Sequence, residues 1–107
     1  MENKDVTLDD VVEIEEFGKK NEEPPPAKSY KVRIDKGKYI FDQQVVSGKD
    51  ILEKAGKTPH TRWRLHQKVH GGQMIEIGYE DNVDLGEKGI ERFTTFELTV
   101  GDGAFDE

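Results

Sequence analysis

The chain contains no cysteine, and this absence removes several chemistries at once. Without a sulfhydryl group, its 107 residues cannot supply a thiol nucleophile, a disulfide framework or a metal site built on thiolates. Long hydrophobic runs are also missing: no apolar stretch approaches the roughly 18 residues of a membrane-spanning helix, and no secretory leader opens the sequence. We therefore expect a cytoplasmic protein that does not enter a membrane.

The sequence also lacks a surplus of positive charge. Sixteen lysines and arginines stand against 23 aspartates and glutamates, which leaves a formal net charge of −7. Proteins that wrap nucleic acid need an excess of basic side chains for the phosphates, so the composition argues against a nucleic-acid partner. Hydrophobic residues are few as well, 33% against 36% charged, which favours one small folded unit with part of the chain outside it.

The negative charge is concentrated at the two ends of the chain. Residues 1–28 hold nine acids and four lysines, and residues 101–107 hold three acids and no base. Residues 29–100 are almost neutral, with twelve bases and eleven acids, and they hold every arginine, the tryptophan and all three tyrosines. We expect one folded domain at 29–100. It lies between an acidic, flexible tail at 1–28 that ends in three prolines and a flexible C-terminal tail at 101–107.

An apolar triplet interrupts the acids of the N-terminal tail. Val11, Val12 and Ile14 lie within Asp9–Glu16, a segment otherwise made of aspartate and glutamate. High charge and low hydrophobicity favour a disordered segment, because little apolar burial offsets the entropy of ordering. Two alternatives stay open: a single amphipathic helical turn capped by Thr7, or a short strand that docks on a sheet edge with its acids against a basic rim.

The domain opens with a pattern typical of a hairpin. Every second residue of Ser29–Asp35 is apolar, which predicts a half-buried strand. A tight turn follows, in which Gly37 is expected to supply a positive φ, and Tyr39–Val46 returns as a second strand. Ser47–Gly56 begins with a cap hydroxyl and has an acid three residues on, close to a capping box, and it predicts a helix.

Further strands are predicted after an extended crossover at Thr58-Pro59. In Arg62–Gln67, Trp63 and Leu65 are expected to face inward. The alternation places three basic residues on the outward face: Arg62, Arg64 and His66. A shorter strand is predicted at Gln73–Tyr79.

The final strand is predicted at Phe93–Val100, with Phe96, Leu98 and Val100 on the core side. A hairpin, one helix, a crossover and a returning strand describe an α+β fold. We expect a mixed sheet of four to five strands packed on that helix.

This order of elements, and four short segments within it, resemble known proteins. The order is that of ubiquitin's β-grasp fold, and the segments are similar to the bacterial multiubiquitin family. The segments are Tyr30–Asp35, Gly48–Gly56, Val83–Gly86 and Gly89–Phe93. The resemblance covers about residues 29–100. It implies a ubiquitin-like domain whose partners are an activating enzyme, a conjugating enzyme, a deubiquitinase-like protease and target-protein lysines, and it implies a role in anti-phage defence.

What the resemblance implies chemically concerns the C-terminal residues. A ubiquitin-like modifier carries a slender tail whose terminal glycine carboxylate is activated and passed to a lysine amine, forming an isopeptide bond. This chain departs from the paired glycines of that pattern, because Gly101 and Gly103 are separated by Asp102 and four residues follow. The resemblance implies a precursor trimmed between Gly103 and Ala104, with Gly101 as the second choice of mature end. Glycines near a chain end also occur without any such role.

The residues themselves carry no set for catalysis. The acids are spread over tails and turns, and Gly71-Gly72 lacks the helix and the lysine–hydroxyl pair of a phosphate-binding loop. Three histidines, without an acid or thiol to complete a set, do not predict a metal site. We expect no enzyme, no cofactor and no metal.

Two surfaces are candidates for contact with partners. The outward Arg62, Arg64 and His66 predict a docking face for acidic proteins. In a further hypothesis, the segment with Val11, Val12 and Ile14 lies against this basic face, either its own or a neighbour's. The alternative to a protein modifier is therefore a non-covalent β-grasp module for binding or assembly.

Overall fold

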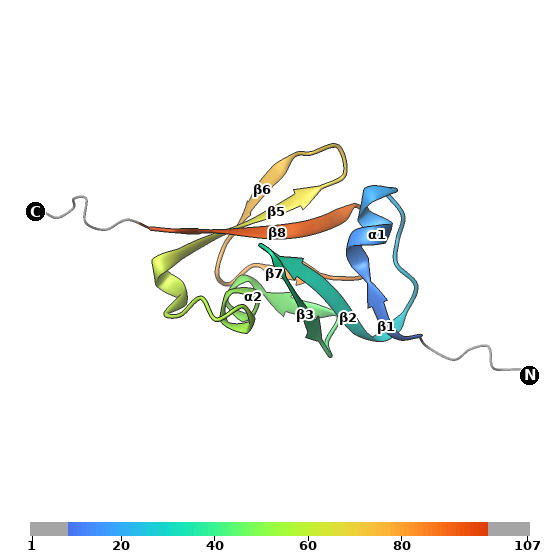
Figure 1. Ribbon diagram of the computed structural model, residues 1–107, viewed down its shortest axis with the longest axis horizontal. Coiled ribbons are helices and arrows are strands. Elements are labelled where there is room, and N and C mark those ends of the chain that lie inside the picture. The colour runs from blue at the N-terminus through green and yellow to red at the C-terminus, as the bar shows by residue number, and fades with distance from the viewer. Residues whose placement is uncertain (1–8, 99–107) are drawn as a thin grey trace, which may run out of the picture.

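The computed structural model describes residues 9–98, and Figure 1 shows how their elements are arranged. The elements follow in this order: β1 (Asp9–Glu13), α1 (Ile14–Lys19), β2 (Ala27–Ile34), β3 (Gly37–Phe41), β4 (Val45–Ser47), α2 (Gly48–Lys54), the 3-10 helix η2 (His60–Arg62), β5 (Trp63–Val69), β6 (Met74–Ile77), β7 (Asn82–Asp84) and β8 (Ile90–Glu97). Both α-helices are short. Neither is long and apolar enough to cross a membrane.

Six of the strands form one mixed sheet. From β2 the order runs through β8 and β5 to β6, while β3 pairs with β2 on its other side and β1 adds a further strand. β4 and β7 form a separate two-stranded sheet. The predicted α+β class is confirmed. Within the described residues, the main sheet has six strands where four to five were predicted, and the two-stranded sheet and helix α1 are additional.

The hairpin of β2 and β3 forms because one face of each strand is apolar. Tyr30, Val32 and Ile34 are buried, and their intervening residues are more exposed, as the alternation predicts. The positive φ of the turn is adopted by Asp35 (φ 56°) and not by Gly37. A Cβ on Gly37 would lie 2.8 Å from the Tyr39 hydroxyl, so a larger residue there would have to displace the end of that side chain.

The predicted capping box begins α2. The Ser47 hydroxyl accepts a hydrogen bond from the Asp50 N–H at 3.0 Å, and the Asp50 carboxylate accepts one from the Ser47 N–H at 3.1 Å. These two bonds satisfy backbone donors that a helix start leaves unpaired. The helix buries Ile51 and Leu52 completely, which makes it the main support beneath the sheet.

The N-terminal segment is the main correction to the sequence analysis. The prediction of a disordered, flexible tail at 1–28 is wrong for residues 9–28, which form β1, α1 and the connection to β2. The strand interpretation is confirmed for Val11 and Val12, which belong to β1 and pair in parallel with β2, whereas Ile14 begins α1. Val12 and Ile14 are buried in the shared core, so only Val11 lies exposed. Thr7, the cap of the helical alternative, lies outside the described residues.

β1 and β8 share one edge of β2. Tyr30 pairs with both Val12 of β1 and Phe41 of β3, so β1 and β3 lie on opposite edges of β2. Ile34 pairs with both Gly37 of β3 and Phe93 of β8, so β8 also lies opposite β3. β1 therefore follows the first half of this edge and β8 meets its end.

Helix α1 packs against the start of β8, where β8 has not yet reached β2. The approach is so close that a Cβ on Gly18 would lie 1.9 Å from the Ile90 carbonyl oxygen. Only glycine fits at this position. Figure 1 shows α1 beside the first residues of β8. Burial of Ile14 and the close contact of Gly18 with the Ile90 backbone join the segment to the domain. The composition of the segment alone did not indicate this.

The acids of the segment meet a basic rim, but a different one from that hypothesised. Glu15 is 5% exposed and its carboxylate accepts a hydrogen bond from the Arg33 Nε at 3.0 Å. Lys38 pairs with Glu13. These bases belong to the β2–β3 hairpin, and the hypothesis that the segment lies against its own Arg62, Arg64 and His66 is wrong, because the parallel register carries its acids to the hairpin.

Replacing Ile14 by alanine tests whether the segment belongs to the core. Loss of a fully buried side chain creates a cavity, and we expect the free energy of unfolding to fall by about 2–4 kcal/mol. Val11→Ala is the matched control, since Val11 is 44% exposed and its loss should cost less than about 1 kcal/mol. Urea unfolding of both variants measures the difference. Equal effects would show that the segment does not contribute to the core.

The pair of Glu13 and Lys38 makes stability depend on pH. The hydrogen bond that Lys38 donates holds the pKa of Glu13 below its ordinary value of about 4.3. A carboxyl with a lowered pKa in the folded state stabilises the fold above its unfolded pKa, and that stabilisation disappears as the pH falls through the folded pKa.

We expect Glu13→Gln to lower the free energy of unfolding by about 0.5 kcal/mol at pH 7, relative to the parent chain. The difference should vanish below the folded-state pKa of Glu13. Thermal unfolding of both proteins from pH 7 downward measures it. In a Lys38→Met background the same substitution should have a smaller effect at pH 7, because only the more distant charges of Lys31 and Arg33 then act on Glu13. A difference that persists there undiminished would assign the stabilisation to another partner.

Candidate functional site

The candidate site lies at the end of β8, where the described chain stops. β8 runs inside the sheet, antiparallel to β5 from Val69↔Ile90 to Trp63↔Glu97. The Leu98 N–H then donates to the Arg62 carbonyl oxygen at 2.8 Å, one step beyond the strand. The backbone is thus held in place up to the last described residue.

Asp35 links the hairpin turn to β8. Its N–H donates to the Phe93 carbonyl oxygen at 2.9 Å. Its two carboxylate oxygens accept hydrogen bonds from the Thr95 N–H at 2.9 Å and the Thr95 hydroxyl at 2.6 Å. Lys57 lies 3.9 Å from the same carboxylate, and its ammonium also stands 4.5 Å above the Trp63 ring. These contacts fix the second half of β8 to two other parts of the fold.

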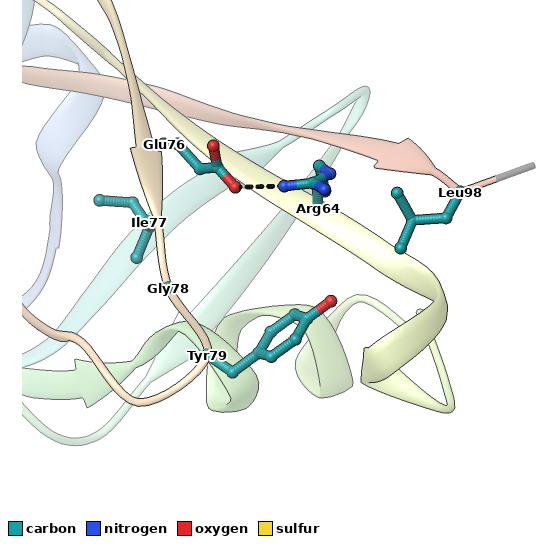
Figure 2. A pocket seen from close by; sticks show the side chains of 6 residues that line it. All are labelled: Arg64, Glu76, Ile77, Gly78, Tyr79 and Leu98. Atoms are coloured by element: carbon teal, nitrogen blue, oxygen red, sulfur yellow. Dashed lines mark hydrogen bonds and ion pairs between the residues drawn. The ribbon is translucent and has the colours of Figure 1, made fainter.

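A hollow of about 220 Å³ lies beside the end of β8, and we call it the β8-end hollow. Figure 2 shows the side chains around it. They come from β5, from β6 and the residues after it, and from the end of β8: Arg64, Glu76, Ile77, Gly78, Tyr79 and Leu98. Leu98 therefore connects the hollow directly to the chain that continues towards the C-terminus.

The chemistry of the hollow suits recognition of a partner. Arg64 and Glu76 form an ion pair at its rim, with 2.7 Å between Nη1 and Oε2, and both side chains are about half exposed. The Tyr79 hydroxyl donates to the Trp63 carbonyl oxygen at 2.7 Å, which engages the polar end of that ring. An apolar side chain or an extended backbone fits such a lining. Its only ionisable groups are the paired Arg64 and Glu76 and the phenol of Tyr79.

The predicted core face of the last strand is wrong by one residue. Pairing places Phe93 opposite Gln67 and Thr95 opposite the buried Leu65, so the odd-numbered residues face α2. Phe96 lies on the outer face and is 49% exposed. From Phe93 to Glu97 the pairing with β5 is regular, so the alternation itself holds, but the apolar Phe96 lies on the outer face and alternation alone assigned it to the core. Val100 lies outside the described residues.

Two of the three residues of the predicted basic face lie on the outer face of the sheet, as predicted. Arg64 pairs with Phe96 and His66 with Thr94, so both lie on the outer face of the sheet. The His66 ring meets the Phe96 ring edge-on, with 5.0 Å between centroids. Arg62 belongs to η2, at the end of the same surface.

The remaining predicted site residues divide into two groups. Gly101, Gly103 and Ala104 lie outside the described residues. Val12 and Ile14 are buried next to β2, and no partner reaches them in the folded chain. Tyr79, Glu76 and Phe96 were not predicted as site residues. The first two lie within the predicted strand Gln73–Tyr79 without any motif, so only their position beside Leu98 marks them.

The three histidines have separate surroundings. His60 meets the Tyr79 ring at 4.8 Å, and the His70 Nδ1 lies 3.2 Å from the Lys19 carbonyl oxygen. Within residues 9–98, no three potential metal ligands gather at one place.

A comparison with protein-family models identifies the family. The multiubiquitin model matches residues 30–97, which is more than half of the chain. The chain belongs to the multiubiquitin family. The expected ubiquitin-like β-grasp fold is thereby confirmed. Comparisons with curated proteins and with solved structures found no match.

The match begins at Tyr30, after β1 and α1. The β-grasp core of this multiubiquitin-family chain thus runs from β2 to β8, and Asp9–Lys19 adds a strand and a helix to it. The β8-end hollow lies within the matched part, apart from Leu98. The end of β8 is therefore a property of the ubiquitin-like domain itself.

Changing Asp35 tests how firmly the end of β8 is held. Asp35→Gly keeps the positive φ accessible but removes both acceptors for Thr95, and we expect a loss of about 2 kcal/mol in unfolding free energy. Amide exchange at Thr95 should accelerate at the same time. Asp35→Asn is the control, since asparagine adopts a positive φ and keeps one carbonyl acceptor. If the Thr95 amide exchanges equally slowly in both variants, the Asp35 carboxylate does not hold the strand.

Proposed function

We propose that this multiubiquitin-family chain is a protein modifier of the bacterial cytoplasm. A protease trims it after Gly103, and activating and conjugating enzymes attach it through that glycine to target lysines. Family membership and the ubiquitin-like domain support the proposal. The chain itself supplies a recognised surface and an acyl group, and the enzymes supply the catalytic residues.

The observation that carries the proposal is the geometry of β8. The strand is central in the sheet, fastened by Asp35, and its ladder to β5 extends to Leu98. Residues after Leu98 therefore start from a rigid platform beside a hollow. An enzyme that binds the domain can locate the start of the tail without ordering it first, which lowers the entropic cost of placing a reactive end.

The proposed reaction sequence uses that end as an electrophile. Water cleaves the peptide bond between Gly103 and Ala104 and releases Ala104–Glu107. The free Gly103 carboxylate attacks ATP, which releases pyrophosphate and leaves an acyl-adenylate. A cysteine thiolate of the enzyme displaces AMP to form a thioester, and a lysine amine displaces the thiol to form an isopeptide bond. Glycine suits this position because it leaves the carbonyl open to attack.

The outer face of the sheet is the proposed docking surface for these enzymes. Arg62, Arg64 and His66 line one side of it, and acidic partners suit their charge. Phe96 provides an exposed apolar surface in contact with His66. The same surface supports the second candidate function, a non-covalent binding module, in which the tail takes no part.

Intact mass spectrometry tests the modifier directly. The full chain is incubated with a cognate protease, activating enzyme and ATP. We expect loss of the mass of Ala104–Glu107, followed by a covalent adduct on the activating enzyme. Gly103→Val should reduce the adduct by at least about tenfold, because a branched side chain crowds the carbonyl under attack. Phe105→Ala is the matched control and should give the same trimmed product and adduct.

Three outcomes decide between the proposals. Trimming to Gly101 moves the mature end but keeps the modifier. An adduct unaffected by Gly103→Val and by Gly101→Val contradicts conjugation through this tail. An unchanged full-length mass together with a stable stoichiometric complex contradicts the modifier and favours the binding module.

A further inference from the structure

The sheet has open edges, and they differ in how they are protected. Natural sheets block unwanted pairing with charges, prolines or bulges on their edge strands. In the described part of the chain, β1 carries Asp10 and Glu13, and β3 carries Lys38. β6 reads Met-Ile-Glu-Ile, and the Glu76 carboxylate is already paired with Arg64 at 2.7 Å. β6 is thus the least protected of the three edge strands of the six-stranded sheet.

Apolar surface is exposed on both faces of β6. Pairing with β5 places Ile75 and Ile77 on the side of Leu65, and Met74 and Glu76 on the side of His66. Ile75 is 40% exposed and Met74 is 42% exposed. An added strand would cover apolar groups above and below the sheet at once.

The backbone of β6 offers hydrogen-bonding groups in alternation. The Val69 N–H donates to the Gln73 carbonyl oxygen at 2.9 Å, so Gln73 and the residues two and four positions later direct their polar groups to β5. The groups of Met74 and Glu76 consequently point to the open edge. Figure 1 shows no other coloured strand beyond β6 on that side.

We propose that a second copy of this chain pairs with β6, antiparallel and about a two-fold axis through Ile75. Met74 then lies opposite Glu76 of the second copy, and both pairs exchange backbone hydrogen bonds. Ile75 faces Ile75 of the second copy in the non-hydrogen-bonded position, where opposed side chains are closest. The surface is self-complementary, as a two-fold contact requires.

Neighbouring registers fit less well. A shift that centres the axis on Glu76 opposes two carboxylates, and like charges directly opposite each other destabilise a sheet. If one strand shifts by a single residue relative to the other, inner-face residues lie opposite outer-face residues. An axis through Met74 separates the two Ile75 side chains and brings glycines of the hairpin into the pairing. The register centred on Ile75 keeps the charges apart and the isoleucines together.

The proposed pairing and the proposed function share residues, because β6 supplies Glu76 and Ile77 to the lining of the β8-end hollow. Two short strands bury less than the roughly 1,200 Å² typical of stable complexes, so a weak and reversible dimer is expected. The two-fold axis directs the ends of the two β8 strands in opposite directions. Dimer formation and conjugation are read in different assays, so failure of one proposal is distinguishable from failure of the other.

Sedimentation velocity of the full chain, from about 10 µM to about 1 mM, tests the pairing. We expect the mean mass to rise towards that of a dimer with concentration. Ile75→Lys should keep the chain monomeric throughout, because it opposes two ammonium groups at the axis. Ile40→Lys is the matched control: Ile40 lies on edge strand β3, is 41% exposed and should leave the dimer intact. An equal mixture of Ile75→Lys and Ile75→Glu variants should dimerise again.

Other outcomes overturn the proposal. They include a monomer at every concentration, a dimer that Ile75→Lys leaves unchanged, and loss of the dimer in both lysine variants. Dimer formation only after deletion of residues 99–107 would show that the chain's own C-terminal segment occupies the edge. In the parent dimer, slower amide exchange at Met74 and Glu76 with rising concentration supports the register.

Discussion

One edge of β2 carries two strands in succession, and the arrangement of the molecule depends on this division. β1 takes the first half of the edge and β8 takes its end, so β8 approaches β2 only near Ile34. The space that this divergence leaves is filled by α1, whose Gly18 comes close to the Ile90 backbone. Without the N-terminal segment, the apolar side chains that Val12 and Ile14 cover would face water, which costs free energy.

The second half of β8 is held by different means. Asp35 bonds to Phe93 and Thr95, and the ladder to β5 continues as far as Leu98. The strand is therefore anchored by packing at its start and by hydrogen bonds at its end. This matters for function because a modifier, as we propose it, needs a fixed point from which a reactive tail departs. The β8-end hollow and the exposed Phe96 give a partner two features to recognise at that point.

Several elements were predictable because their signals are local. The alternation in β2, the capping box of α2 and the inward Leu65 depend on residues close together in the chain, and all were found as expected. The N-terminal segment was mispredicted because its acids dominate any composition window. Their partners, Lys38 and Arg33, are 25 and 18 residues away, and only the parallel register brings them together. The core face of β8 was mispredicted for a related reason, since Phe96 is apolar but exposed, and only the pairing of Thr95 with the buried Leu65 shows which side of the strand faces the core.

The sequence by itself determined the fold class, the β-grasp order of elements and the family, because these follow from periodicity, turn residues and short segments that need no knowledge of distant contacts. Tertiary structure alone decided that residues 9–28 are part of the domain, that Phe96 faces outward and that Leu98 borders a hollow with Tyr79. Burial and pairing across the sheet depend on where several strands meet. A charged segment becomes stable once its few apolar groups reach a core that other residues have built.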